Sequence, residues 1–179
     1  AKPRWNHLCQ GDCGGTCDIL DVHTHIGPPP MGWVIEHTSV KAQVERFVKR
    51  MDRCGIELSL VADLRPLFGD GLQGNRLALE SIAPYPDRLK AYIGFNPHYA
   101  ESLVPAIEEF VANPAVAGFK LLCDYWRVPV TDPRFIPVWE AAHRHRLPIL
   151  LHTWEGACDS PAMLRDICPK YPDAIFLIG

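Results

Sequence analysis

The chain has 179 residues, of which 47% are hydrophobic and 22% are charged, a balance typical of a globular domain with a sizeable core. Its net charge of −3 excludes the basic surface of a nucleic-acid-binding protein, so we expect a small-molecule partner. No apolar run is long enough to span a bilayer, and Ala1 to Trp5 lack the apolar core of a signal peptide, so the sequence predicts a cytoplasmic protein.

Residues 1–16 form a segment rich in cysteine and glycine, and we place the folded domain at residues 17–179. Cys9, Cys13 and Cys17 recur at four-residue intervals, with His7 as a candidate fourth ligand for zinc or an iron–sulfur cluster. The spacing matches no strong zinc pattern, so free thiols in a loop are the favoured interpretation. The remaining cysteines occur singly, which argues against a disulfide framework: Cys54, Cys123, Cys158 and Cys168.

From residue 17 onward the chain repeats one unit, a short apolar strand followed by an amphipathic helix. Strands are predicted at Cys17 to His23, Ile56 to Ala62, Leu89 to Phe95, Val116 to Leu122, Pro148 to His152 and Ala174 to Ile178. Their spacing of about 26 to 39 residues suits alternating β and α elements. Helices are predicted from Val40 to the stop at Gly55, at Asn75 to Ala83, at Glu101 to Ala112, at Asp132 to His145 and at Ser160 to about Cys168.

This alternation predicts an α/β fold with parallel strands and leaves two architectures. A doubly wound open sheet that binds nucleotides would carry a glycine-rich phosphate loop after the first strand, and this sequence has none there. We therefore expect a (β/α)8 barrel of the TIM type, of which this chain holds the first six βα units. Complete barrels of this type have about 250 residues.

Histidines fall at the predicted carboxyl ends of two strands, where barrel active sites lie. His23 and His25 are two residues apart on a strand and so share a face, a pair that suits zinc or another divalent transition metal. His152 ends the fifth strand and would face the pair across the barrel mouth. The same spacing at His143 and His145 serves as a control, because on a helix these side chains point apart and are expected to be surface residues.

Four stretches resemble the amidohydrolase-2 group of the amidohydrolase superfamily, which includes metal-dependent hydrolases and nonoxidative decarboxylases such as aminocarboxymuconate semialdehyde decarboxylase. The stretches occur in the order typical of that group. They are Asp21-Val22-His23-Thr24-His25-Ile26-Gly27, Gly118-Phe119-Lys120-Leu121, Thr131-Asp132-Pro133-Arg134-Phe135 and Leu147-Pro148-Ile149-Leu150-Leu151-His152-Thr153.

The resemblance implies a divalent metal, zinc or else manganese, held by His23, His25 and His152. It also implies a sixth-strand histidine, expected at position 180 of a longer gene product, and an eighth-strand aspartate. That aspartate would lie beyond Gly179, so no catalytic residue is identifiable in this chain. Asp21 shares the face of the two histidines and is a candidate for orienting one of them.

Lys120 has three interpretations. The resemblance allows carboxylation to a ligand that bridges two metals. We favour instead a lysine that binds an anionic substrate group or pairs with a carboxylate in the barrel mouth. A solvated lysine is disfavoured because Lys120 lies within an apolar strand. For substrate contact we select four residues from the loops that follow strands: Asn96, His98, Arg127 and Trp154.

The favoured function is hydrolysis of an amide, ester or lactone by a metal-activated water. The alternatives are metal-dependent decarboxylation of an aromatic or dienoic acid, and a noncatalytic or regulatory remnant of a barrel. Because six barrel strands leave two unpaired edges, we expect the isolated chain to be unstable or to self-associate, and a homo-oligomer remains open.

Overall fold

Six parallel strands form one curled sheet in the computed structural model, which describes residues 19–28 and 39–179. The Cys/Gly-rich segment with Cys9 and Cys13 lies outside the described residues, and so does Cys17, the predicted start of the first strand. The strands are β1 (Ile19–Ile26), β2 (Ile56–Asp63), β3 (Leu89–Gly94), β4 (Val116–Leu121), β5 (Pro148–Leu151) and β6 (Ile175–Ile178). They are arranged in the order β1-β2-β3-β4-β5-β6, so every strand pairs with its neighbour in sequence.

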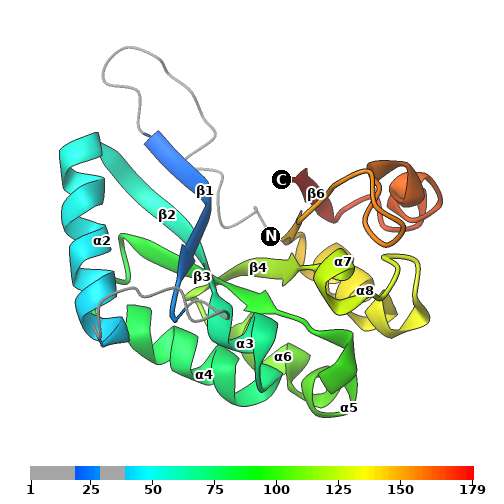
Figure 1. The fold of residues 1–179 in the computed structure, drawn as a ribbon, viewed down its shortest axis with the longest axis horizontal. Coiled ribbons are helices and arrows are strands. Elements are labelled where there is room, and N and C mark those ends of the chain that lie inside the picture. Colours follow the sequence, from blue (N-terminus) through cyan, green and yellow to red (C-terminus); the bar gives the residue numbers. More distant parts are fainter. Residues whose placement is uncertain (1–18, 29–38) are drawn as a thin grey trace.

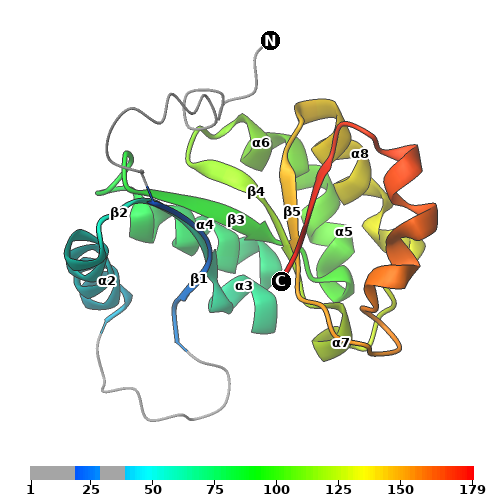
Figure 2. The ribbon, with the colours of Figure 1, turned by 90° about the horizontal axis from the view of Figure 1, so that it is seen from above.

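Helices cover the outer side of this sheet, as Figures 1 and 2 show. They are α2 (Val40–Cys54), α3 (Leu64–Phe68), α4 (Gly71–Ile82), α5 (Ala100–Leu103), α6 (Ile107–Ala112), α7 (Cys123–Trp126) and α8 (Ile136–His145). The curled sheet with its alternating helices is part of a TIM-type barrel, which confirms the predicted fold class. Within the described ranges, no helix combines the length and apolar character needed to cross a membrane.

The predicted start and end of α2 are confirmed. The Ser39 side chain accepts a hydrogen bond from the backbone N–H of Ala42 at 3.3 Å, as an N-cap should. Gly55 ends the helix with a φ of 68°, and its N–H reaches the carbonyls of Met51 and Asp52. This left-handed conformation suits glycine, because a side chain would strain the backbone there.

Helix α4 begins at Gly71, four residues before its predicted start. Asp70 caps it by accepting from the N–H of Gln73 at 2.8 Å. Gly71 and Gly74 are packing residues of this helix. A Cβ on Gly74 would lie only 2.5 Å from the backbone nitrogen of Pro66, so glycine lets α4 approach α3 closely.

Proline changes two other predicted helices. The helix predicted at Glu101 to Ala112 is α5, a 3₁₀ turn (Val104–Ala106) and α6 in succession, because Pro105 has no N–H to donate. The predicted fifth helix was wrong: the segment forms two 3₁₀ helices, Pro161–Asp166 and Cys168–Lys170. Pro161 and Pro169 each remove a donor, and the Ser160 side chain makes no capping bond.

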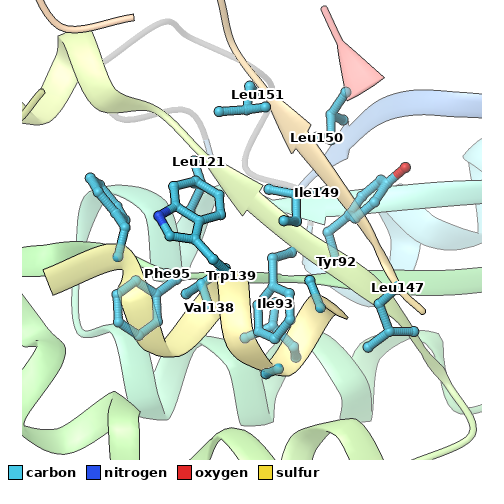
Figure 3. Packing of buried hydrophobic residues seen from close by; sticks show 14 of the residues in the cluster. Tyr92, Ile93, Phe95, Leu121, Val138, Trp139, Leu147, Ile149, Leu150 and Leu151 are labelled. Atoms are coloured by element: carbon cyan, nitrogen blue, oxygen red, sulfur yellow. The ribbon is translucent and has the colours of Figure 1, made fainter. Parts of the chain in front are cut away.

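The core lies between the sheet and its outer helices. A row of four aromatic rings connects the segment after β3 with α8 and β6. The ring centroids of Phe95 and Phe135, the latter in the 3₁₀ helix Pro133–Phe135, are 6.2 Å apart. Trp139 on α8 lies 5.8 Å from Phe135 and 5.8 Å from Phe176 on β6. Figure 3 shows Trp139 and Val138 packed among the strand residues. A second cluster packs α2 against β1, β2 and β3 through residues that include Val44, Val48, Met51 and Val61.

Candidate metal centre

The predicted histidines come together at the carboxyl-terminal edge of the sheet. His23 and His25 project from β1 with their ring centroids 5.4 Å apart, and His152 directly follows β5. Lys120 of β4 is fully buried, and its Nζ lies 3.3 Å from Nε2 of His23. A Cβ on Gly179 would lie 2.9 Å from Nδ1 of His23, so the end of β6 also adjoins this ring. Strands distant in sequence therefore converge on His23.

The imidazoles are neutral at pH 7. Their side chains reach the surface of the open half-barrel but are partly buried. The pKa of His23 is lowered to about 4, mainly by this burial and secondly by the positive charge of Lys120. Burial and then Lys120 also lower the pKa of His25 and of His152. A neutral imidazole is the form that binds a metal, so the protonation states fit a metal centre.

His25 has the hydrogen bond expected of a metal ligand. Its Nδ1 lies 3.2 Å from the carbonyl oxygen of Ala62, and because a carbonyl can only accept, Nδ1 carries the proton. Nε2 is then left with a lone pair for a metal. Asp21 does not orient a ring as we expected: its Oδ1 accepts from the backbone N–H of His23 at 3.1 Å.

The other two histidines have Nε2 engaged by N–H donors. Lys120 Nζ contacts that atom of His23, and Trp154 Nε1 donates to Nε2 of His152 at 2.5 Å. Within residues 19–28 and 39–179, no group of three or more His, Cys, Asp or Glu side chains is placed so that it could hold a metal ion. The donor chemistry thus fits a divalent metal, whereas the geometry requires two N–H donors to move aside.

Burial lowers the pKa of Lys120 to about 8, so most of its amine is charged at pH 7. The ion pairs found among the described residues do not include Lys120, although one of our interpretations paired it with a carboxylate. Its complete burial excludes the solvated lysine. A buried ammonium without an anionic partner is a strong site for an anionic group.

An open pocket of about 440 Å³ lies beside His152, and its walls are Asp124, Tyr125, Arg127 and Trp154. The Tyr125 and Trp154 rings each contact His152, with centroids 5.3 and 5.8 Å from its ring. Arg127, with a φ of 54°, caps the end of α7 and forms no ion pair with a described residue. Two of the four residues predicted to contact substrate, Arg127 and Trp154, therefore share one pocket.

Asn96 and His98 have structural partners instead of lining this pocket. The buried Asn96 side chain accepts from the backbone N–H of His98 at 3.0 Å and caps the 3₁₀ helix Pro97–Tyr99. The His98 ring donates from Nε2 to the carbonyl of Trp126 at 3.0 Å. The control pair on α8 also behaves as a surface pair, since His143 contacts Asp173 and His145 contacts Glu108.

Sequence reasoning missed Asp159. This residue is 2% exposed, and neither carboxylate oxygen has a hydrogen-bond partner in the described part of the chain. Its position directly before Ser160-Pro161 made it look like an ordinary polar loop residue. No sequence pattern distinguishes a buried loop aspartate from a solvated one.

A family model described as amidohydrolase (Amidohydro_2) matches residues 21–179. The chain belongs to the amidohydrolase-2 family. No curated protein matches the sequence.

Solved structures agree with the amidohydrolase-2 fold. The 5-carboxyvanillate decarboxylase of Sphingomonas paucimobilis matches 92% of this chain and 68% of its own, with a TM-score of 0.62 and 15% identity. The same enzyme from Novosphingobium aromaticivorans, with bound manganese and 3-methoxy-4-hydroxy-5-nitrobenzoic acid, matches 90% and 66%, with a TM-score of 0.63 and 15% identity.

A Staphylococcus aureus protein provisionally assigned as an amidohydrolase matches 90% of this chain and 67% of its own, with a TM-score of 0.67 and 13% identity. The chain thus spans about two thirds of the length of these three proteins. At such low identity the likeness establishes the fold alone.

Proposed function

We propose that this chain carries the metal-binding and substrate-binding part of an amidohydrolase-2 enzyme that decarboxylates a small aromatic carboxylic acid. The observation that carries the proposal is the pocket beside His152, with two aromatic walls and an arginine that forms no ion pair with a described residue. Support also comes from the decarboxylases among the matched structures, one of which holds an aromatic acid and manganese.

Three of the four pocket walls suit a planar anion, and the fourth is the carboxylate of Asp124. A ring can pack against Tyr125 and Trp154, which are 61% and 65% exposed and therefore available for contact. The Arg127 guanidinium, which lacks an ion-pair partner among the described residues, can bind a carboxylate through two parallel hydrogen bonds. A volume of about 440 Å³ lies within the usual range for small-molecule sites.

His23, His25 and His152 would hold the divalent ion, zinc or manganese, which when bound supplies a Lewis acid that orients the carboxylate and hydroxyl groups of the substrate. Two other side chains of this chain would act beside the metal. The indole N–H of Trp154 would release Nε2 of His152 to the metal, and the Lys120 ammonium would offset the negative charge of the substrate.

In the reaction, the bond between the ring and its carboxyl carbon breaks, carbon dioxide leaves and the ring carbon takes up a proton.

Carbon dioxide release tests the reaction. The native protein, loaded with manganese or zinc, is assayed against a panel of hydroxybenzoates and methoxybenzoates. We expect metal-dependent release, and we expect Arg127→Lys to raise KM about tenfold, because lysine cannot form the paired hydrogen bonds of a guanidinium. Turnover that is unchanged in Arg127→Lys would contradict the role of this pocket.

Hydrolysis of an amide, ester or lactone is the second candidate, favoured by the family description and by the Staphylococcus aureus structure. A metal-dependent gain of one acid equivalent from esters or lactones, without carbon dioxide from any benzoate, would replace the first candidate with the second. No turnover of either kind in metal-loaded native protein would favour the noncatalytic alternative.

The metal site has its own test. The double variant His23→Ala/His25→Ala is expected to lose the divalent metal that copurifies with the native protein. His143→Ala/His145→Ala is the matched control, because it removes two histidines with the same spacing from the surface of α8. Elemental analysis giving equal metal in the wild type and the first variant would exclude these residues as ligands.

A further inference from the structure

A second polar cluster lies between the loop that follows β5 and the first turn of α7. Asp159 in the loop is 2% exposed, and both its carboxylate oxygens lack hydrogen-bond partners within the described ranges. Buried polar groups in proteins are nearly always hydrogen-bonded, and a buried, ionised carboxylate is strongly unfavourable unless a positive charge accompanies it. Asp159 therefore requires an explanation that packing does not supply.

The glycine at position 156 shows where Asp159 points. A Cβ on Gly156 would lie 2.8 Å from Oδ1 of Asp159 and 3.0 Å from Oδ1 of Asp124. The two carboxylates are thus aimed at one point beside the Gly156 backbone. Glycine keeps that point free, because any side chain would collide with both oxygens.

The described residues form no ion pair with either carboxylate, although both lie near enough to His152 for their charges to raise its pKa. Neither Asp124 nor Asp159 occurs in the ion pairs of residues 19–28 and 39–179, although Arg127 lies only three positions after Asp124. The neighbouring Cys123 adds no anionic sulfur, since burial raises the pKa of its thiol to about 12. The available ligands are therefore oxygens.

We propose that Asp124 and Asp159 bind a hard divalent cation, magnesium or calcium, at the Gly156 backbone, near His152 but without an imidazole ligand. Two carboxylates balance the charge of such an ion, and backbone carbonyls and water complete the coordination that these cations prefer. Imidazoles are poor ligands for both cations, so the site is chemically distinct from the histidines. This proposal does not depend on the reaction proposed above.

A cation at this site would connect two segments that form the pocket. Asp124 belongs to α7, the helix that ends at Arg127, and Asp159 belongs to the loop that carries Trp154. A cation between the two carboxylates would fasten these segments to each other. It would thereby fix the distance between the arginine and the tryptophan that form two walls of the pocket.

Calorimetric titration of chelator-treated native protein with magnesium chloride or calcium chloride tests the proposal. We expect one site in the wild type, and an affinity at least tenfold weaker in Asp159→Asn and in Asp124→Asn. Glu155→Gln is the matched control, an exposed carboxylate of the same loop, and should bind within twofold of the wild type. Comparing the two salts identifies the preferred cation.

Thermal unfolding gives a second measurement. The preferred cation, at about 100-fold above its Kd, should raise the wild-type unfolding midpoint by about 5 °C and leave that of Asp124→Asn unchanged. Asp124 is exposed, so this variant should fold even if Asp159→Asn does not. The effect should survive in His23→Ala/His25→Ala, which separates it from the histidine site. No cation binding to the wild type, or equal binding by Asp124→Asn, would overturn the proposal.

Discussion

Lys120 is a fully buried amine whose nearest polar partner is another nitrogen base, Nε2 of His23. Burial lowers its pKa to about 8, which shows that the fold penalises its positive charge. We expect Lys120→Met to raise the free energy of unfolding by about 1–3 kcal/mol at pH 7, because methionine fills a similar volume without a charge.

Urea unfolding of the wild type and Lys120→Met checks this expectation, with Lys90→Met as the control. Lys90 contacts only a backbone carbonyl near the surface, so its removal should change stability by less than 0.5 kcal/mol, a size typical of surface substitutions. A less stable Lys120→Met protein would show that the amine has a stabilising partner.

Asp132 gives a prediction of pH dependence. The hydrogen bond from the Arg134 side chain is the main cause that lowers the pKa of Asp132 from 3.8 to about 2. The ionised carboxylate therefore stabilises the fold above about pH 4, and this contribution disappears as the pH falls from 4 to 2.

Asp132→Asn should cost about 0.5–1 kcal/mol at pH 7, a modest value because the pair is partly solvated. Chemical unfolding at pH 7 and at pH 3 measures the difference between the two proteins. A gap that widens toward pH 3 would contradict the assigned cause.

Single residues also show where sequence reasoning ended. The positions of His23, His25 and His152 at strand ends follow from strand periodicity and from the family motif, and the structure brings all three to one edge. The partners of their rings do not follow from the sequence. The contact of His25 with the Ala62 carbonyl depends on the register between β1 and β2. The contact of His152 with the Trp154 indole depends on the conformation of the loop after β5.

At the scale of elements, five of the six strands were predicted to within one residue, because short apolar runs between turn residues are a strong local signal, whereas β1 extends three residues beyond its predicted end at His23. Helices were predicted less well. The 3₁₀ helices after β5 depend on two prolines, and the early start of α4 depends on how closely α3 packs, which only the folded structure reveals.

Alanine substitutions at two glycines compare the stability cost of a crowded strand contact with that of a strained backbone conformation. Gly118 of β4 faces the backbone of β5, where a Cβ would lie 2.0 Å from the carbonyl oxygen of Pro148. Gly118→Ala should force the two strands apart and cost 3 kcal/mol or more, on the order of the largest single-residue effects.

Gly55→Ala is the comparison, since a Cβ there meets no atom within 4 Å and only the left-handed conformation is strained. We expect a cost of about 1 kcal/mol. Thermal unfolding of both variants measures the two costs, and similar values would show that the β4–β5 contact is easily relaxed.

At the scale of the whole molecule, the sheet that the described residues form has two open edges. Strands β1 and β6 each pair on one side only, and apolar side chains on them are exposed, including Ile19 at 48% and Ile178 at 53%. Unpaired parallel edges with apolar side chains are sites of association. The 179-residue chain on its own is therefore expected to self-associate.

Light scattering during size-exclusion chromatography tests this expectation. Ile178→Lys should lower the average mass, because a charge on the β6 edge opposes pairing with another edge. Val104→Lys, an exposed apolar position away from both edges, is the control. A monomeric wild-type chain with a sharp unfolding transition would show that the curled sheet is self-sufficient.

The simple strand order has a consequence for biosynthesis. Because each strand pairs with the one made just before it, a nascent chain can add one βα unit at a time without waiting for distant sequence. Of the six described strands, β1 leaves the ribosome first, and its outer edge stays without a strand partner from this sheet while the other five are added. Among these strands, β1 therefore needs protection by a chaperone for the longest time.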